Sequence, residues 1–404
     1  MNIAFFVVPK IRKEYIMNRK KNIYLMYAIV FLQGMVFYGP IATLYRQVNG
    51  MSVFQITYIE SISYILCILF EIPWGIIADK IGYKKTMCFC CMLYFVSKLI
   101  FWRADIFAEF LFERILLSIV IAGFSGVDSS ILYLSCDKGE SQKIFSIYNA
   151  LGTIGMLMAS FIFAVFVGDN YRIAAFLTVI SYGLAALLSC FISEVKHEEK
   201  QKICLKEFKC VFLRIVRNKP LLCFLIAVAF ITQTHQTITV FLNQIQYEKC
   251  GLSASSIGFV YIVITLVGML GVFSDAFTRK KGTKYAGVSI FTIVIVSCCT
   301  LAITNNAIIS ICGVLILNLA NSFFQPLQME EQNKQVLSTN RATELSIYAI
   351  IIDSICAGTS VIFGALAKSS LEKAFLFGGI LSLAGLILFI IWYKNRKTKN
   401  IIIH

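Results

Sequence analysis

The pattern that decides the fold is clearest in residues 284–328, which read KYAGVSIFTIVIVSCCTLAITNNAIISICGVLILNLANSFFQPLQ. Two apolar runs, each of about 20 residues and so long enough to cross a bilayer core of about 30 Å, are separated by a short polar gap. A backbone in hydrocarbon must satisfy its own hydrogen bonds, and a helix does so within one segment. The stretch therefore predicts two membrane-spanning helices joined by a short loop.

Similar runs recur along the whole chain of 404 residues, of which 58% are hydrophobic and only 15% are charged. A composition this apolar is not that of a soluble globular protein. The runs are also too long for a membrane barrel, whose strands alternate over about ten residues. We expect an all-α integral membrane protein with spans at 22–44, 52–78, 84–103, 107–133, 144–167, 172–193, 220–245, 253–274, 284–304, 306–328, 344–367 and 372–393.

The net charge of +15 is carried by basic residues that lie in alternate loops. Membrane topology explains this distribution better than binding to nucleic acid, which would gather the charge on one domain. If the N-terminus is cytoplasmic, 29 of the 37 Lys and Arg residues fall in inside segments and 6 in outside segments. The positive-inside rule then predicts a multi-pass protein with both termini in the cytoplasm.

The longest polar stretch, residues 194–219, divides the expected helices into six and six. The predicted organisation is a cytoplasmic N-terminal segment at 1–21, a six-helix bundle at 22–193 and a cytoplasmic linker at 194–219. A second six-helix bundle follows at 220–393, and a cytoplasmic tail occupies 394–404.

The two halves resemble each other in sequence at offsets of 196 to 201 residues. GMSVFQI at 50–56 corresponds to GLSASSI at 251–257, and the tripeptide SIY at 146–148 recurs at 346–348. Further pairs are Ser160-xxx-Ala164 with Ser360-xxx-Gly364, and Gly75-xxx-Asp79 with Gly271-xxx-Asp275. Several matches in order indicate a duplicated six-helix unit, and many transporters are built from paired repeats around a central site.

Residues 69–85, LFEIPWGIIADKIGYKK, resemble the signature that the major facilitator superfamily carries in the loop between its second and third helices. The residues that match this motif, which we interpret as a conformational gate, are Gly75, Asp79, Gly82, Lys84 and Lys85. Positive-inside topology alone would account for the two lysines, but the complete spacing favours the family. Gly75 permits close helix contact, Gly82 permits a tight turn, and Asp79 offers a negative charge to the N-terminus of a neighbouring helix.

The resemblance implies a major facilitator fold of two pseudo-symmetric six-helix bundles. Together with EIPWG at 71–75, the stretches SGVDSSILY at 125–133 and RATELSI at 341–347 look like a bacterial branch rich in drug-efflux proteins. That branch implies the bacterial cytoplasmic membrane, multidrug resistance and antiport. One departure is that YNALGTIGMLMAS, at 148–160, lacks the proline that drug antiporters commonly carry in their fifth helix.

Ionisable residues inside the expected spans are candidates for proton coupling, because each costs about 2.5–3.5 kcal/mol at the centre of a helix on insertion scales. They are Glu71, Arg114, Asp128 and Asp353. For the acids, the alternative is a hydrogen-bonded group at a helix interface. For Arg114, it is a paired or snorkelling side chain.

Polar residues on one face of the expected helix 220–245 predict a substrate cavity, and similar residues occur in the expected helices 22–44 and 306–328. His235 is a possible proton relay, since histidine titrates near neutral pH, or a hydrogen-bonded lining residue. The candidate cavity residues are Gln33, Phe37, Gln233, Gln236, Thr237, Gln244, Asn321 and Gln325.

These features favour a proton-coupled exporter of lipophilic or amphiphilic small molecules. The alternatives are an importer or exchanger of a specific polar solute and a non-transporting membrane sensor. No HExxH, GxSxG or GxxxxGK[ST] motif is present in the sequence, so we do not expect an enzyme. We expect no cofactor and no metal, and the expected partners are a substrate, protons or another coupling ion, and the bilayer, with the protein a monomer.

Overall fold

The computed structural model describes residues 4–124, 126–136, 140–195, 205–336 and 341–402. In these residues the regular secondary structure is entirely helical. Twelve helical segments within them are long and apolar enough to cross a membrane. The prediction of an all-α membrane fold with twelve spans is therefore confirmed.

Each expected span overlaps one observed segment. The observed segments are Arg19–Val48, Val53–Phe70, Tyr83–Arg103, Phe107–Ser135, Lys143–Val167, Tyr171–Ser189, Lys219–Lys249, Ala254–Lys281, Thr283–Ile303, Ala307–Gln335, Glu344–Ser369 and Leu371–Asn395. The agreement follows from the physical constraint itself, because the bilayer sets the length of each apolar run.

The chain forms two compact units, which we describe separately. Unit 1 comprises Met1–Pro40 and Leu66–Lys200, and unit 2 comprises Ile41–Ile65 and Gln201–His404. Residues 41–65, which belong to the first two spans, thus pack with unit 2. The predicted division into bundles at the linker 194–219 stays a prediction.

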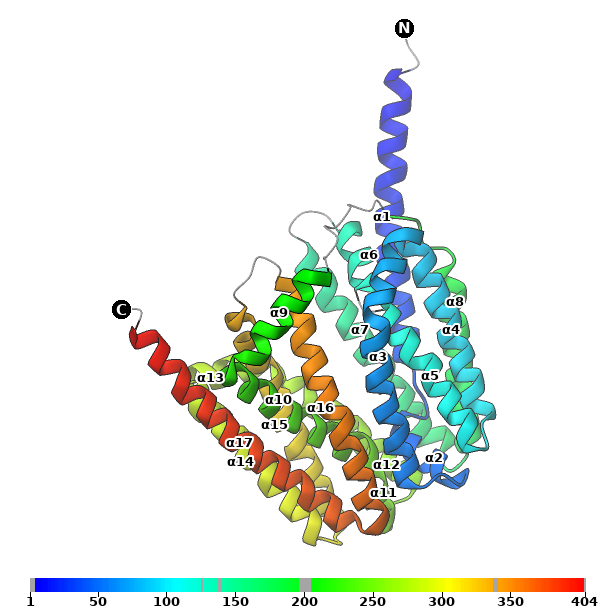
Figure 1. Ribbon diagram of the computed structural model, residues 1–404. Helices are drawn as coiled ribbons and strands as arrows, with labels where there is room; N and C mark the ends of the chain where they lie inside the picture. Colours follow the sequence, from blue (N-terminus) through cyan, green and yellow to red (C-terminus); the bar gives the residue numbers. More distant parts are fainter. Residues whose placement is uncertain (1–3, 125, 137–139, 196–204, 337–340, 403–404) are drawn as a thin grey trace. The chain divides into compact units, whose positions relative to one another are not determined.

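Unit 1 contains α1 and five further complete helices, together with the second part of α3 (Figure 1). Its helices are α1 (Ala4–Gly34), α3 (Val53–Ile81), α4 (Tyr83–Arg103), α5 (Phe107–Phe124), α6 (Val127–Ser135), α7 (Ser141–Ile162) and α8 (Tyr171–Ser189), with the π-helix η2 at Phe163–Val167. In this unit α1 packs on α7 and α8, and α4 packs on α5 and α8.

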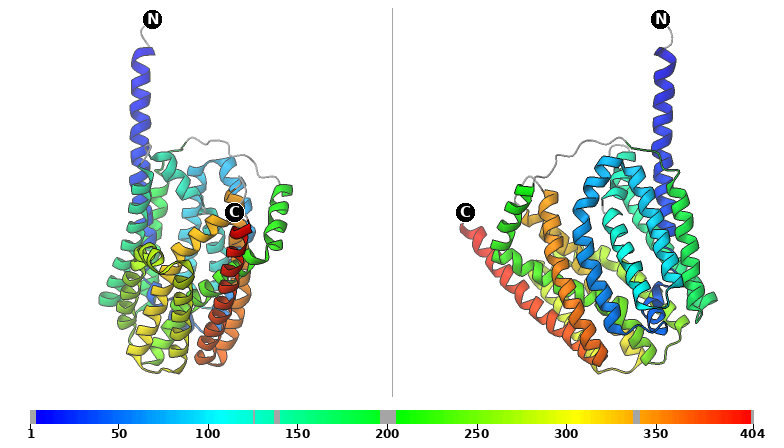
Figure 2. Two further views of the ribbon diagram at one scale, coloured as in Figure 1. Left: turned by 90° about the vertical axis from the view of Figure 1, so that its left-hand side faces the viewer. Right: turned by 45° about the vertical axis from the view of Figure 1, so that its right-hand side comes forward.

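Unit 2 begins at Ile41, the last residue of the 3-10 turn η1 (Gly39–Ile41), and continues with α2 (Ala42–Val48) and the first part of α3. Its other elements are α9 (Leu205–Arg217), α10 (Lys219–Gln236), the π-helix η3 (Thr237–Leu242), α11 (Asn243–Lys249), α12 (Ala254–Gly268), the 3-10 helix η4 (Met269–Phe273), α13 (Ser274–Lys281), α14 (Thr283–Ile303), α15 (Ala307–Gln335), α16 (Arg341–Ser369) and α17 (Leu371–Ile402). The helix α17 runs alongside α14 and α10 (Figure 2).

Small residues set the closest helix contacts in both units. In unit 1 a Cβ on Gly155 of α7 would overlap the carbonyl oxygen of Phe31 on α1, and one on Gly34 would overlap the carbonyl of Gly152. In unit 2 a Cβ on Gly364 of α16 would overlap the side chain of Thr57 on α3. Glycine at these points lets the backbones approach closely, as in other small-xxx-small pairs.

The internal repeat is visible in the backbone of the turns. Gly50 and Gly251 both have φ of 83°, which lies in the region that only glycine enters without strain. Gly82 has φ of 94° and ψ of 152° before α4, and Gly282 has φ of 78° and ψ of 149° before α14. These matched turns agree with the predicted duplication of a six-helix unit.

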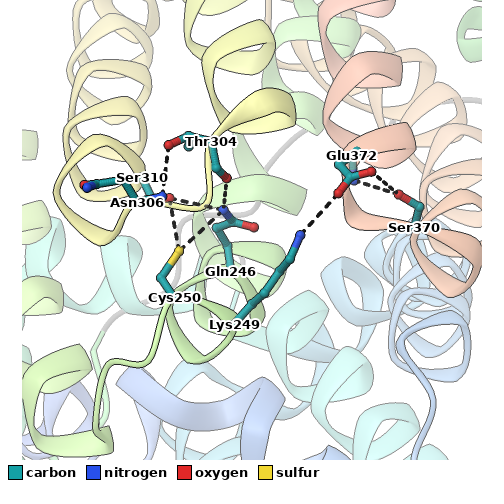
Figure 3. A network of polar contacts seen from close by, with 8 residues as sticks. All are labelled: Gln246, Lys249, Cys250, Thr304, Asn306, Ser310, Ser370 and Glu372. Atoms are coloured by element: carbon teal, nitrogen blue, oxygen red, sulfur yellow. Dashed lines mark hydrogen bonds and ion pairs between the residues drawn. The ribbon is translucent and has the colours of Figure 1, made fainter.

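One end of unit 2 is held together by a network of polar contacts that involves α11, α15, α17 and the turns next to them (Figure 3). Gln246 of α11 is buried and donates from Nε2 to the carbonyl oxygen of Thr304 at 2.9 Å and to Ser310 Oγ at 3.1 Å. Lys249 Nζ lies 3.2 Å from Glu372 Oε1, so α11 is also tied to the start of α17. The network fixes the end of the seventh span against its neighbours.

Candidate functional site

Five of the described spans contain a break or a non-α turn of helix. The fifth contains the π-helix η2 and the eighth contains the 3-10 helix η4, and the other three are the first, the fourth and the seventh. In the first span α1 ends at Gly34 and helical structure resumes at Gly39. In the fourth, Gly126 has φ of 85° between α5 and α6, and the seventh contains the π-helix η3. Irregular backbone at this depth survives only where protein groups satisfy it, and such interruptions frequently mark functional sites.

The interruption of the first span is satisfied by three side chains of α8. The backbone nitrogen of Phe37 donates to Thr178 Oγ1 at 3.0 Å. Ser181 Oγ donates to the carbonyl oxygen of Met35 at 3.0 Å, and Tyr182 OH donates to that of Gln33 at 2.6 Å. Side-chain hydrogen bonds within unit 1 therefore stabilise the break in the helix.

Gln33 and Phe37, two of the predicted cavity residues, lie on either side of this break. Gln33 is half-buried, and its Nε2 lies 3.6 Å from Cys91 Sγ. Phe37 is buried with 5% of its surface exposed, so its ring packs in the interior of unit 1. The role of both in a cavity stays a prediction.

Close to the same break lies a buried ion pair between α4 and α5. Lys98 Nζ is 3.7 Å from Glu113 Oε1, and their side chains are 5% and 1% exposed. Lys98 also donates to Tyr38 OH at 2.9 Å. Its ammonium group lies 5.6, 5.1 and 5.4 Å from the ring centres of Tyr38, Tyr94 and Tyr182.

This pair is not among the site residues predicted from the sequence, although the sequence contains a signal for it. Lys98 lies five residues before the end of α4, and Glu113 lies six residues after the start of α5. Two antiparallel helices joined by a short loop place such residues at equal depth in the membrane. Arg114, which was selected instead, is half-buried and next to Glu113.

Asp128 lies in the first turn of α6, immediately after the interruption of the fourth span. The backbone nitrogen of Ser129 donates to Asp128 Oδ1 at 2.6 Å, and Tyr148 OH donates to Oδ2 at 3.3 Å. The carboxylate is half-buried and sits at a helix N-terminus, where the macrodipole favours negative charge. The predicted acid is thus held by neutral groups that can also bind its protonated form.

Tyr348, the tyrosine of the second SIY tripeptide, contacts a carboxylate, as Tyr148 of the first SIY tripeptide contacts Asp128. Tyr348 OH donates to Glu344 Oε2 at 3.5 Å, and Glu344 forms an ion pair with Arg214 of α9. The two repeats therefore share a tyrosine–carboxylate contact, but in unit 2 the carboxylate is neutralised by an arginine.

In the seventh span, three predicted lining residues bond within unit 2. Gln233 Nε2 donates to Thr237 Oγ1 at 2.9 Å, and both side chains are buried. Gln244 Nε2 donates to the carbonyl oxygen of Val240 at 2.9 Å, and its Oε1 accepts from the backbone nitrogen of Thr43 at 2.8 Å. These bonds hold polar side chains in place around the π-helix η3, while Gln233 Oε1 is buried and accepts no hydrogen bond from the described residues.

His235 joins three helices of unit 2. Its Nε2 lies 3.0 Å from Asn318 Oδ1 on α15 and 3.3 Å from Thr239 Oγ1 on η3. Asn318 Nδ2 donates to the carbonyl oxygen of Ile264 on α12 at 2.8 Å. His235 and Asn318 are half-buried, so this neutral cluster combines hydrogen-bond donors and acceptors in an apolar surrounding.

The remaining candidates fall at different places. Gln236 is half-buried, Asn321 is buried with 4% exposed and Gln325 is exposed. Asp353 is half-buried on α16. The side chain of Glu71 lies outside the described part of the chain.

The loop signature is described only in part, because the surroundings of Gly75 and the side chain of Asp79 lie outside the described part of the chain. Gly82 lies beside the carboxylate of Glu194, whose Oε2 would be 2.9 Å from a Cβ at that position. Glu194 Oε1 accepts from the backbone nitrogen of Lys84 at 3.3 Å, so an acid caps the N-terminus of α4. Lys85 is exposed beside it.

A surface hollow of about 380 Å³ lies where α4 meets α5. It is lined by Ile100, Arg103, Ala104, Ala108, Glu109 and Phe112. None of the predicted site residues lines it, so we do not assign substrate binding to it.

Twelve apolar spans in the described residues, several of them irregular and with polar clusters packed beside the breaks, define a multi-pass membrane protein. The chain belongs to the major facilitator superfamily, whose sequence profile matches residues 23–330. This membership places it among transporters rather than enzymes, as the sequence predicted. The assignment to a drug-efflux branch is a finer statement, which we take up below.

The comparisons give one curated relative and several solved structures. An uncharacterized MFS-type transporter of Methanocaldococcus jannaschii, MJ1560, is 25% identical over 201 residues, covering 48% of this chain. The chain spans about half the length of that relative, 51%.

Among solved structures, a mutant of the nucleoside transporter NupG has a TM-score of 0.79 at 15% identity, covering 92% of this chain and 100% of that one. A bacterial homolog of the human lysosomal transporter Spinster has a TM-score of 0.71 at 15% identity, covering 94% and 95%. The human organic anion transporter MFSD10 has a TM-score of 0.61 at 14% identity, covering 92% and 99%. At these identities the likeness shows the fold alone.

Proposed function

We propose that this protein is a secondary transporter that exchanges protons for amphiphilic small molecules by alternating access, in the direction of export. The observation that carries the proton coupling is Asp128, a half-buried acid at the break of the fourth span. Its contacts with Tyr148 OH and Ser129 N suit both protonation states. Glu71 and Asp353 stay candidates for the same role, with Arg114 as a neighbouring charge.

The proposed substrate class follows from the polar groups of unit 2. His235, Asn318 and Thr239 present neutral donors and acceptors, and His235 Nε2 lies 3.0 Å from Asn318 Oδ1 and 3.3 Å from Thr239 Oγ1. Such groups orient a ligand through a few hydrogen bonds, while the apolar residues around them bind its carbon skeleton. A molecule with both an apolar part and neutral polar groups matches this combination.

The direction of export is supported by the resemblance of residues 69–85, 125–133 and 341–347 to a branch rich in drug-efflux proteins. Proton antiport would drive it, because an acid that binds a proton on one side and releases it on the other can exchange it for substrate. The bacterial cytoplasmic membrane, with both termini in the cytoplasm, is the location that this proposal implies.

The test measures accumulation of lipophilic dyes and antibiotics in drug-sensitive cells with and without the protein. We expect lower accumulation in cells that contain the protein, and we expect an uncoupler to abolish the difference. Asp128→Asn should lose the difference while the protein remains inserted, because the amide cannot carry a proton. Unchanged efflux in Asp128→Asn would remove Asp128 from the mechanism, and no difference across the panel would remove drug export.

A carrier for one polar solute is the second candidate, and the cluster around His235 favours it. Three hydrogen-bonding side chains, one each from α10, η3 and α15, converge there. A site for lipophilic drugs would not require such a specific arrangement of polar groups. The similar fold of NupG, which is named a nucleoside transporter, makes nucleosides the first class to test. Uptake of labelled nucleosides into vesicles, lost in His235→Ala, would favour this function over drug export.

A further inference from the structure

The ion pair of Lys98 and Glu113 has no part in the function proposed so far. Both side chains are almost fully buried within membrane-crossing helices of unit 1. Removing two charges from water costs as much as their attraction usually returns, so a buried ion pair is weak evidence for stabilisation. Its presence in an apolar unit therefore requires another reason.

The internal repeat shows that the six-helix unit does not need this pair in order to fold. An offset of 200 residues aligns Gly82 with Gly282. The same offset places Cys298 opposite Lys98 and Gly313 opposite Glu113. Both residues are buried, so unit 2 fills these positions with small uncharged groups.

The surroundings of Lys98 suit an ammonium group whose counter-ion is sometimes neutral. Three tyrosine rings lie 5.1–5.6 Å from Nζ, a distance at which the face of a ring attracts a cation. Tyr38 OH accepts a hydrogen bond from the same nitrogen at 2.9 Å. A lysine permanently paired with a carboxylate would not require this additional stabilisation.

The three tyrosine rings around Lys98 Nζ, which we call the cage, also connect the ion pair to the interrupted first span. Tyr38 belongs to the non-helical stretch between α1 and η1, and it lies two residues before Pro40, where unit 1 ends in the chain. Tyr182, another ring of the cage, donates to the carbonyl oxygen of Gln33 at the start of the break. A change at Lys98 would therefore reach the backbone of residues 33–40 directly.

We propose that Glu113 binds and releases a proton during the transport cycle, and that Lys98 transmits the change to the first span through Tyr38. The proton comes from water and adds to a carboxylate oxygen, so the pair changes from net neutral to a single positive charge. It leaves by the reverse step, and no other bond changes. The titratable groups around the pair are Tyr38, Tyr94 and Tyr182, with Arg114 adjacent on α5.

This inference rests on the proposed coupling to protons, but its test needs no substrate. The full-length protein is placed in liposomes, and the infrared carbonyl stretch of protonated carboxyl groups is recorded over a series of pH values. We expect one pH-dependent component of this band in the wild type to be absent in Glu113→Gln and to remain in Asp128→Asn. A band unchanged in Glu113→Gln would overturn the proposal.

Hydrogen exchange of the peptide that covers residues 33–48 supplies the second readout, with labelling times scaled for the intrinsic effect of pH. We expect protection to change with pH in the wild type and to be independent of pH in Glu113→Gln. The double variant Lys98→Met with Glu113→Gln removes both charges at similar volume, so it should fold normally and show neither signal. A pH response that persists in the double variant would refute the role of the pair.

If drug and nucleoside transport both fail while Glu113 still titrates, the proposed function is wrong and the proton site stands. If transport is proton-coupled while Glu113 never titrates, the proposed function stands and this inference is wrong.

Discussion

Gly155 on α7 lies against the backbone of α1, where any Cβ would overlap the carbonyl oxygen of Phe31. The overlapping atom belongs to a helix backbone and cannot rotate away as the end of a side chain can. In the sequence, the stretch around Gly155 differs from that of drug antiporters by its missing proline. In the structure, its glycines allow the first and fifth spans to pack at close range.

Replacement of Gly155 by alanine tests this contact. The added methyl group must push α7 away from α1, so we expect a loss of about 1–3 kcal/mol in stability, as for other overpacked sites. The measurement is the thermal unfolding midpoint of the purified protein in detergent.

The matched control is Gly358→Ala on α16, since no atom lies within 4 Å of a Cβ at Gly358. Alanine favours a helix over glycine by about 1 kcal/mol, so this variant should be as stable as the wild type or slightly more stable. Equal losses in the two variants would contradict the close contact at Gly155.

Among the elements, α9 shows how the linker is attached to unit 2. Arg214 of α9 forms an ion pair with Glu344 near the start of α16, and Tyr348 OH contacts the same carboxylate at 3.5 Å. The Glu344 side chain is 2% exposed and that of Arg214 is 45% exposed. Because the arginine reaches water, the pair is worth less than a fully buried one.

Replacement of Arg214 by glutamine removes the positive partner of a buried acid, which keeps its contact with Tyr348. We expect a loss of about 1–2 kcal/mol, reduced from the value of a buried pair by the exposure of the arginine. Hydrogen exchange should rise along Leu205–Arg217 relative to α10. Arg217→Gln, at an exposed position on the same helix, should leave exchange in α9 unchanged; an equal rise there would argue against a specific anchor.

Over the whole molecule, the two units share backbone turns but differ in their polar contents. Gly82 and Gly282 begin equivalent helices with nearly the same dihedral angles. The Lys98–Glu113 pair belongs to unit 1 and aligns with uncharged residues in unit 2, whereas His235 and Asn318 belong to unit 2. Duplication thus accounts for the shared helices and turns of the two units, and later divergence accounts for their different polar residues.

The orientation of the whole chain is a prediction that fusion proteins can check. Green fluorescent protein joined after His404 should fluoresce, because it folds in the cytoplasm and not after export through the usual secretion route. The same reporter inserted at Cys250, in the loop between α11 and α12, should remain dark. The reverse pattern would overturn the cytoplasmic assignment of the termini, which rests on the distribution of 29 and 6 basic residues.

Much of the fold could be predicted because the bilayer imposes it on the sequence. A span needs about 20 apolar residues whatever it packs against, so the apolar runs located every span, including 284–304 and 306–328. The glycines of the turns could also be recognised, since Gly50 and Gly251 occupy a backbone region that other residues rarely enter. The loop signature at 69–85 identified the family for the same reason, because its spacing is local.

The partners of the polar side chains were decided by the tertiary structure. Gln233 and Gln244 have the spacing of a cavity-lining face, yet they bond to Thr237 and Thr43 inside unit 2. Lys98 was passed over, although it forms an ion pair with Glu113 across two helices. The sequence by itself determined which segments enter the membrane, because that depends on the composition of each segment alone. Only the tertiary structure decided which charged side chains form ion pairs and which side-chain amides form hydrogen bonds, because those contacts depend on distances of a few ångströms between different helices.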